Sequence, residues 1–343
     1  MRWTDCHVHV LDGGLEALDA LTQSQKDYGY SRSNFLSVEG MGSCAQNALA
    51  IAFKLLSPDH YAFGSLHYRF PYDFAEEAQQ LWDIGFDGIK MIENKPTERK
   101  TLGYRQDDER YDGFYETLQA LDIPVLAHVN DPRDFWDPAK APQWAIDAGY
   151  AYTDGTFVPF EEILEESVRM LEGYPKLRVC FAHLMFLSDD GPTLRKLMES
   201  HPNMWLDITS GTEMYVNFSQ DLPFWRQFFL DFSDRILYGT DNCDRPNEHE
   251  REIGHIINAM QKRFLTGADT FPLWDSQIRG ADLPIPVQEK ICGGNFSRFA
   301  GEKPRPLDKK KALHYLESRL ADPRFRLTEQ EAELIGKICE KLA

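Results

Sequence analysis

Short apolar runs alternate with longer amphipathic stretches along most of this 343-residue chain, and this alternation constrains the fold more than any other feature. The runs have the length and composition of buried parallel strands, and the stretches between them have helical spacing. Eight runs predict strands at residues 3–10, 34–38, 61–66, 88–92, 124–129, 178–184, 204–208 and 235–239. Eight strand–helix units favour a closed (β/α)8 TIM barrel, an α/β fold, over an open doubly wound sheet.

The remaining segments extend this pattern. Helices are predicted at residues 15–28, 44–56, 73–84, 112–121, 159–171, 192–200, 222–232 and 248–264. No Gly-x-Gly-x-x-Gly follows the first strand, which removes the main cue for a Rossmann domain. We therefore expect residues 1–306 to form one barrel domain and residues 307–343 a C-terminal helical extension, with helices at 309–320 and 328–342. The extension could serve as an oligomer surface, for example in a homodimer.

Two aromatic-rich stretches, residues 131–154 and 265–286, are predicted as loop insertions at the top of the barrel. Such loops often form lids or pocket walls, although inert cover is an equal alternative. Trp274 and Arg279 of the second insertion are therefore candidate substrate-binding residues. Arg69, just after the third strand, is either a clamp for a substrate carboxylate or a surface residue.

Composition and charge narrow the class of partner. Hydrophobic residues make up 42% of the chain, enough for a large core, and the formal net charge is -18. A strongly acidic surface repels phosphate backbones and anionic lipids, so we expect a small-molecule substrate and neither nucleic acid nor membrane as the main partner. Six cysteines without Cys-x-x-Cys spacing, and no apolar run near the ~20 residues of a membrane span, favour a cytoplasmic protein with reduced thiols.

Histidines and an aspartate stand at the ends of several predicted strands, where a (β/α)8 barrel places its active site. The first strand ends in His7-Val8-His9, and period two puts both imidazoles on one side. Two neutral imidazoles are a partial ligand set for zinc or another divalent transition metal. The fifth strand ends with His128, the sixth with His183 and the eighth with Asp241. Together these strand ends predict a metal site.

The same motifs, in this order, resemble those of the amidohydrolase superfamily, in particular its branch of nonoxidative decarboxylases and hydrolases. That branch carries His-x-His on strand one, histidines on strands five and six, and Gly-Thr-Asp on strand eight, matched here by residues 239–241. Residues 291–299 are similar to the branch's C-terminal Gly-Asn-x-x-Arg segment, and residues 85–90 to its entry into strand four. The similarity spans residue 3 to about residue 301.

The resemblance implies a role for each of these residues. His7, His9, His128 and Asp241 would bind one divalent metal, Zn²⁺ first and Mn²⁺ or Fe²⁺ as alternatives, with water in an open position. Asp241 would also accept a proton from that water. His183 would stand beside the metal as an acid/base or would polarise the substrate.

Two further residues have alternative roles. In binuclear relatives a strand-four lysine is carbamylated and bridges two metals, so Lys90 could do the same, with His128 and His183 holding the second ion. Alternatively, Lys90 is a cation near the mouth that pairs with Glu93 or with a substrate carboxylate. Asp5 shares a strand face with His7, and it either orients a ligand histidine or pairs with a nearby cation.

These residues are compatible with three functions. The first is a metal-dependent hydrolase in which activated water attacks an amide, lactone or ester carbonyl, with His183 or Lys90 steadying the oxyanion. The second is a nonoxidative decarboxylase of an aromatic or unsaturated acid. The third is a non-catalytic metal-binding barrel, which a missing ligand would favour; all the expected ligand positions are occupied.

Overall fold

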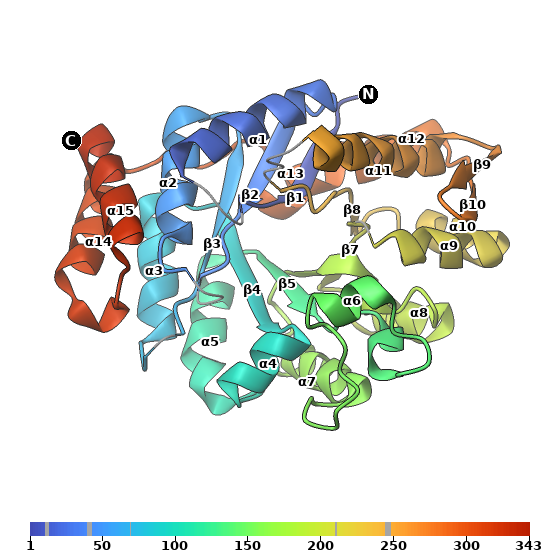
Figure 1. Cartoon of the computed structure of the whole chain (residues 1–343), viewed down its shortest axis with the longest axis horizontal. Coiled ribbons are helices and arrows are strands. Elements are labelled where there is room, and N and C mark those ends of the chain that lie inside the picture. Colours follow the sequence, from blue (N-terminus) through green and yellow to red (C-terminus); the bar gives the residue numbers. More distant parts are fainter. Residues whose placement is uncertain (11–13, 40–42, 69, 210, 244–247) are drawn as a thin grey trace.

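Eight parallel strands in sequence order form the centre of the molecule, each hydrogen-bonded to the next (Figure 1). The computed structural model describes residues 1–10, 14–39, 43–68, 70–209, 211–243 and 248–343. The strands are β1 (Thr4–Val8), β2 (Arg32–Leu36), β3 (Tyr61–Ser65), β4 (Gly88–Asn94), β5 (Val125–Val129), β6 (Val179–Phe181), β7 (Met204–Asp207) and β8 (Ile236–Leu237). The backbone N–H of Cys6 donates to Tyr238 O at 3.0 Å, and that of His9 to Asn242 O at 2.8 Å. These bonds nearly close the sheet, which confirms the predicted (β/α)8 barrel.

Helices surround the sheet. Those at predicted positions are α1 (Leu15–Asp27), α2 (Gln46–Leu56), α3 (Phe74–Ile84), α5 (Asp112–Leu121), α7 (Phe160–Gly173), α8 (Gly191–Ser200), α10 (Leu222–Asp231) and α11 (Glu248–Thr266). Additional short helices are α4 (Pro96–Leu102), α6 (Gln143–Asp147), α9 (Thr212–Gln220), α12 (Ile285–Glu289) and α13 (Asn295–Ala300), with single turns η1 (Glu109–Tyr111), η2 (Arg133–Trp136), η3 (Ala182–Phe186) and η4 (Lys290–Gly294). Among the described helices, none is both long enough and apolar enough to cross a membrane. All six cysteines are described, and each is a free thiol.

Apolar side chains fill the end of the barrel opposite the site. Phe296 and Phe299 of α13 pack against Phe63 of β3, with ring centroids 6.3 and 6.5 Å apart. Gly88 makes room for this packing, because a Cβ there would lie 2.6 Å from the Phe63 ring. With this end filled, the polar strand ends are left to line the opposite mouth.

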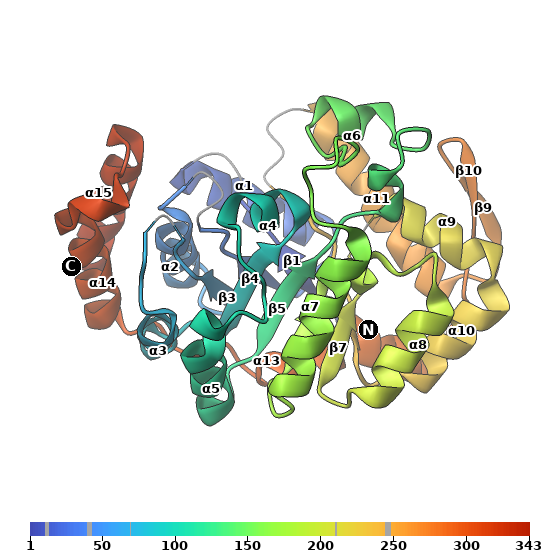
Figure 2. The ribbon, with the colours of Figure 1, turned by 90° about the horizontal axis from the view of Figure 1, so that it is seen from below.

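The two predicted insertions differ in structure. Residues 131–154 contain η2 and α6 and enclose a small apolar cluster of Phe135, Ala145 and Tyr152. Residues 265–286 contain an antiparallel hairpin, β9 (Thr270–Leu273) and β10 (Ser276–Arg279), which packs against α9 at the edge of the molecule (Figures 1 and 2).

The C-terminal segment is a helical pair, α14 (Lys309–Ala321) and α15 (Glu329–Leu342), joined through the turn η5 (Pro323–Phe325). It lies at the opposite end of the molecule from the hairpin, against α2 and α3 (Figure 2). Tyr315 and Arg319 of α14 are buried in that contact. Both helices predicted in this segment are therefore present; the domain boundary at residue 306 remains a prediction.

Candidate metal centre

His7 and His9 present bare ring nitrogens to each other at the end of β1. Their Nε2 atoms are 3.0 Å apart. His7 Nδ1 contacts Asp207 Oδ2 at 2.9 Å, and His9 Nδ1 contacts the carbonyl oxygen of Leu36 at 2.9 Å. Because these partners accept hydrogen bonds, each Nδ1 is a donor, and in the neutral imidazole that binds a metal the lone pair then lies on Nε2.

Asp241 completes the group from the end of β8. Its Oδ1 lies 3.4 Å from His7 Nε2 and 3.4 Å from His9 Nε2. Three electron-pair donors that converge in this way repel one another unless a cation binds among them. Two imidazoles and a carboxylate are a donor set that zinc accepts, with room for a further ligand. The residues therefore fit a divalent metal.

Hydrogen bonds to the Asp5 carboxylate link the ends of β1 and β8 next to this group. Asp5 accepts hydrogen bonds from Thr240 N at 3.0 Å, from Thr240 Oγ1 at 2.6 Å and from His7 N at 3.2 Å. Gly239 allows the close approach, since a Cβ there would lie 2.9 Å from His7 Cβ and 2.5 Å from Thr209 Oγ1. Asp5 thus supports the site through the backbone of both strands, and its contact with His7 is to the backbone N–H rather than to the ring.

His128 and His183 extend the group across the mouth. His128 Nε2 contacts Asn130 O at 2.8 Å, which leaves Nδ1 bare, and His183 Nδ1 contacts Thr209 O at 3.2 Å, which leaves Nε2 bare. The two rings are 5.1 Å apart by centroid, and the His183 ring is 5.5 Å from that of His7. The four imidazoles therefore form a continuous row.

The ligand atoms are close enough together to share one metal ion at only one end of this row. The ligand atoms of His7, His9 and Asp241 all lie within 4.8 Å of one another, and His128 is not part of that group. Its assignment as a metal ligand remains a prediction. Burial lowers the pKa of both His128 and His183 to about 4, so both rings are neutral at pH 7, as metal ligands must be.

Lys90 reaches the same site from β4. Its side chain is buried, and Nζ lies 3.4 Å from His7 Nε2. Burial lowers the pKa of Lys90 to about 8, and burial together with the Lys90 charge holds the pKa of His7 well below its usual value. Glu93 does not pair with Lys90: both of its carboxylate oxygens are buried without a hydrogen-bond partner among the described residues. Residues three apart on a strand face opposite sides, so this suggested pair does not form.

Asp207, which the sequence analysis did not single out, holds the site together from β7. Besides His7 Nδ1, it accepts hydrogen bonds from His183 N at 2.8 Å and Thr209 N at 3.1 Å. A carboxylate that holds the outer nitrogen of a ligand histidine fixes its ring and tautomer. The available signal was its position, since Asp207 ends an apolar strand as His128 and Asp241 do.

The backbone turns sharply where three of these strands end. Asn130 has φ 64°, His183 has φ 53° and Asp241 has φ 57°, all left-handed. Such a conformation costs about 1–2 kcal/mol per residue without glycine, and it persists where surrounding contacts impose it. Strain therefore accumulates where the side chains turn toward the mouth.

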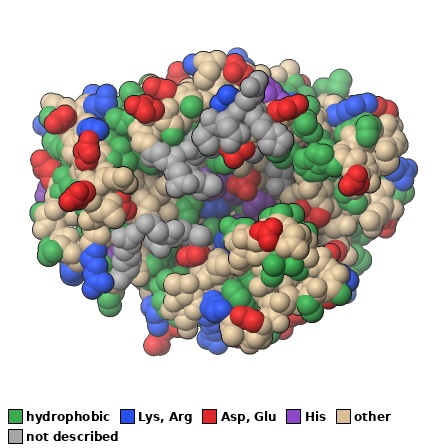
Figure 3. Space-filling model, in the orientation of Figure 1, with side chains coloured by type: hydrophobic (Ala, Val, Ile, Leu, Met, Phe, Trp, Pro, Cys, Tyr) green, Lys and Arg blue, Asp and Glu red, His purple; other side chains and the backbone are tan. Residues whose placement is uncertain are grey.

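Two of the three predicted substrate-binding residues lie away from the site. Arg69 falls outside the described residues. Trp274 stands in the β9–β10 turn with 57% of its surface exposed, and the Arg279 N–H donates to Ser219 Oγ at 2.9 Å. Figure 1 shows this hairpin away from the strand ends, so the structure does not bring Trp274 and Arg279 to the histidines. The space-filling view shows instead a hollow at the mouth with histidine and acidic side chains in its floor (Figure 3).

Comparisons with known proteins identify a matching family and agree with the barrel fold. A family model described as amidohydrolase matches residues 4–299. No curated protein matches the sequence. An uncharacterised TIM-barrel protein from Bordetella bronchiseptica has a TM-score of 0.57 at 16% identity, over 87% of this chain and 98% of its own.

Two further solved structures with this fold are of named enzymes. The 4-oxalomesaconate hydratase LigJ from Rhodopseudomonas palustris has a TM-score of 0.53 at 14% identity, over 93% of this chain and 100% of its own. The 5-carboxyvanillate decarboxylase LigW from Sphingomonas paucimobilis has a TM-score of 0.52 at 12% identity, over 87% of this chain and 98% of its own. At such identities the likeness shows a common fold.

Proposed function

This chain belongs to the amidohydrolase family, a family of metal-dependent enzymes, and from that premise we propose that it is a hydrolase in which water attacks an amide, lactone or ester carbonyl of a small molecule. One observation carries the proposal: the bare nitrogens of His7 and His9 and the carboxylate of Asp241 converge at the barrel mouth.

A divalent cation among these donors would polarise the carbonyl and lower the pKa of water. Zn²⁺ suits two imidazoles and a carboxylate, and Mn²⁺ or Fe²⁺ can replace it. We assign His128 as a further ligand through Nδ1, because its Nε2 is engaged by a backbone carbonyl.

The remaining roles follow from position and charge. The Asp241 carboxylate is partly exposed and takes up the proton of the attacking water. His183, neutral and with Nε2 bare, orients the substrate carbonyl or moves a proton. Lys90, mostly protonated at pH 7, steadies the oxyanion.

Nonoxidative decarboxylation of an aromatic or unsaturated acid is the second candidate. The buried Lys90 cation beside the histidines favours it, because a substrate carboxylate would need a countercharge there. The fold shared with the 5-carboxyvanillate decarboxylase LigW is compatible with it. The convergence of His7, His9 and Asp241 argues against a barrel that has lost its metal site.

The test is turnover by the zinc-loaded protein on a panel of lactones, amides, esters and phenolic acids. Acid release without CO2 supports the hydrolase, CO2 evolution supports the decarboxylase, and metal binding without any turnover supports the non-catalytic barrel.

The matched variant is His128→Ala, which should abolish turnover while leaving the circular dichroism spectrum unchanged. His201→Ala is the control, because His201 lies at the C-terminal end of α8, where its Nδ1 contacts Leu197 O. Unchanged turnover in His128→Ala would contradict the proposed site.

A cytoplasmic location and a homodimer stay predictions. Light scattering after gel filtration measures the oligomeric state.

A further inference from the structure

A second group of ligand-type side chains lies near the ends of β2 and β3. Glu39 follows β2, Cys44 precedes α2 and His67 follows β3, and all three are buried. One ligand atom from each lies within 4.8 Å of the other two, and Cys44 Sγ is 3.9 Å from His67 Nδ1. We refer to these three residues as the Glu39 cluster.

Glu39 itself indicates that a ligand belongs here. Its Oε1 accepts a hydrogen bond from Asn47 N at 2.7 Å. Its Oε2 is buried and has no hydrogen-bond partner among the described residues. A buried carboxylate oxygen left without a donor or a cation is costly, so it needs a partner that the described side chains do not supply.

The charges around Glu39 lead to the same conclusion. Three buried acids, Glu39, Glu77 and Glu331, surround one buried cation, Arg319. Arg319 donates to Glu77, and Glu331 accepts from two backbone N–H groups, one at 2.6 Å and one at 2.8 Å. Among these three acids, Glu39 is the one with a buried carboxylate oxygen that has no hydrogen-bond partner among the described residues.

We propose that the Glu39 cluster binds a second divalent cation of the zinc class, separate from the metal at the barrel mouth. A carboxylate and a thiolate together neutralise a divalent ion, and a neutral imidazole completes a mixed O, S and N donor set that selects zinc over magnesium or calcium. Tetrahedral zinc with these donors sets them roughly 3.5 Å apart, close to the observed sulphur–nitrogen distance. The Cys44 thiol releases its proton to solvent when the ion binds.

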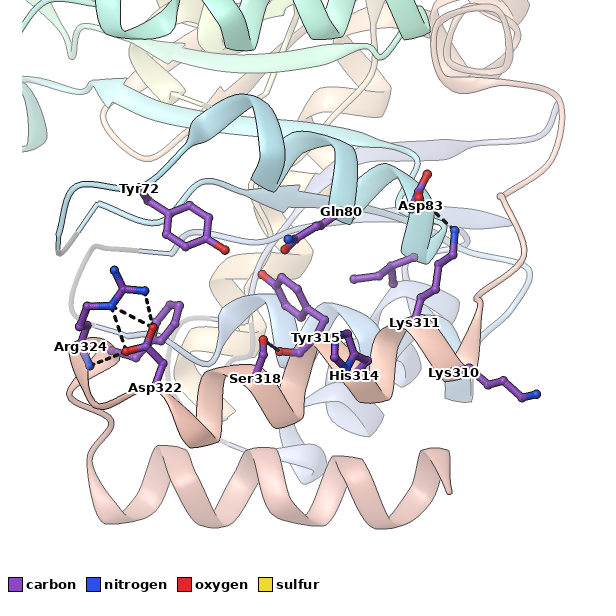
Figure 4. Close-up of a pocket in the computed structure, with 12 residues that line it drawn as sticks. Tyr72, Gln80, Asp83, Lys310, Lys311, His314, Tyr315, Ser318, Asp322 and Arg324 are labelled. Atoms are coloured by element: carbon purple, nitrogen blue, oxygen red, sulfur yellow. Dashed lines mark hydrogen bonds and ion pairs between the residues drawn. The ribbon is translucent and has the colours of Figure 1, made fainter.

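The turn between the two C-terminal helices covers this cluster. Phe325 of η5 covers the cluster: its carbonyl oxygen lies 3.6 Å from Cys44 Sγ, and its ring centroid lies 4.7 Å from that of His67. A pocket of about 590 Å³ between α3 and α14 is lined by Tyr72, Tyr315 and the same Phe325 (Figure 4). Phe325 thus borders both this pocket and the cluster.

The experiment is metal analysis and cobalt substitution of the full-length protein. A Co²⁺ ion bound to thiolate has a sulphur-to-metal charge-transfer band in the near ultraviolet. Wild type and Cys292→Ser, a control at another buried cysteine, should show this band. Cys44→Ser should lose the band and about one metal equivalent per chain. Absence of the band in wild type, or its persistence in Cys44→Ser, would overturn the proposal.

Three further variants keep the result interpretable. If Cys44→Ser does not fold, Glu39→Gln preserves size, removes the charge and should still lose the ion; unchanged metal content in it would count against the site. Lys90→Ala would remove the second ion of a carbamate-bridged pair at the mouth but should leave the thiolate band. His9→Ala should lose activity and keep the band, so failure of this proposal is distinct from failure of the proposed hydrolase.

Discussion

At the residue scale, acceptors select which nitrogen of each histidine is free. One ring nitrogen of each histidine at the mouth donates a hydrogen bond to a fixed acceptor. These acceptors are the Asp207 carboxylate and the carbonyl oxygens of Leu36, Asn130 and Thr209. The opposite nitrogen is then left with its lone pair. The mouth is thereby arranged for a cation before any cation binds, which reduces the reorganisation that binding requires.

Replacing Asp207 by Asn should weaken metal binding about 10–100-fold, because the amide cannot accept from His7 Nδ1 and from both backbone N–H groups as the carboxylate does. Competition with a chromophoric chelator measures the affinity. Asp234→Asn is the control, since Asp234 forms a surface ion pair with Lys290. Equal affinity in wild type and Asp207→Asn would show that the carboxylate does not orient His7.

Glu93 should make the stability of the protein fall as the pH rises. Burial raises its pKa to about 8, against 4.5 for an unperturbed glutamate. The folded state keeps a proton that the unfolded state releases, so this contribution is fully present below pH 4.5 and is lost as the pH rises toward 8. Relative to wild type, Glu93→Gln should gain on the order of a few kcal/mol between pH 5.5 and 8.5.

Urea unfolding at both pH values measures this difference. Glu172→Gln, at an exposed position of α7, is the control and should follow the wild-type pH dependence. A Glu93→Gln profile parallel to that of wild type would mean that Glu93 is already ionised in the folded protein.

At the element scale, the contact between α3 and α14 depends on a buried ion pair. Arg319 of α14 donates to Glu77 of α3 and to Tyr315, and His67 N donates to Glu77 Oε2 at 2.9 Å. Both charged side chains are nearly inaccessible to solvent. Removing one partner would leave the other charge buried, which is far more costly than losing a surface pair.

Arg319→Met should therefore lower the free energy of unfolding by about 3–5 kcal/mol. Arg324→Met, which removes an exposed pair with Asp322 near the same turn, should change it by less than about 1 kcal/mol. Denaturant unfolding followed by tryptophan fluorescence compares them. An equal loss of unfolding free energy in the two variants would show that burial does not make the Glu77–Arg319 pair more important for stability than an exposed pair.

At the scale of the whole molecule, the C-terminal pair acts as part of the barrel's packing. Leu316, Ile335 and Ile338 of this pair are fully buried and belong to the same apolar core as α2 and α3. A chain ending at residue 306 would expose the faces of α2 and α3 that these residues cover. We expect one cooperative unfolding transition for the complete chain.

Truncation at residue 306 should thus lower the melting temperature and increase binding of a hydrophobic dye, with the barrel's circular dichroism spectrum largely retained. Differential scanning calorimetry and dye fluorescence test this. A truncated chain with the wild-type melting temperature would show instead that residues 307–343 are a separable extension.

Much of the fold and part of the site could be predicted from sequence. The eight strands and their helices follow from local hydrophobic period, and a barrel brings strand ends together by topology alone. His7, His9 and Asp241 could therefore be named, and the structure places them within reach of one metal. Exact strand ends could not be predicted: β6 stops at Phe181 because His183 turns left-handed to meet Asp207 and Thr209.

The sequence by itself determined the barrel and the side chains at its mouth, because both depend on residue order and spacing within single strands. Only the tertiary structure decided which atoms of those side chains are free, since the contact between His7 and Asp207 joins residues 200 positions apart. The tertiary structure likewise decided that Lys90 faces the histidines and that Glu93 faces away from them. It also accounts for the Glu39 cluster, whose members meet only after the segments that follow β2, precede α2 and follow β3 pack together.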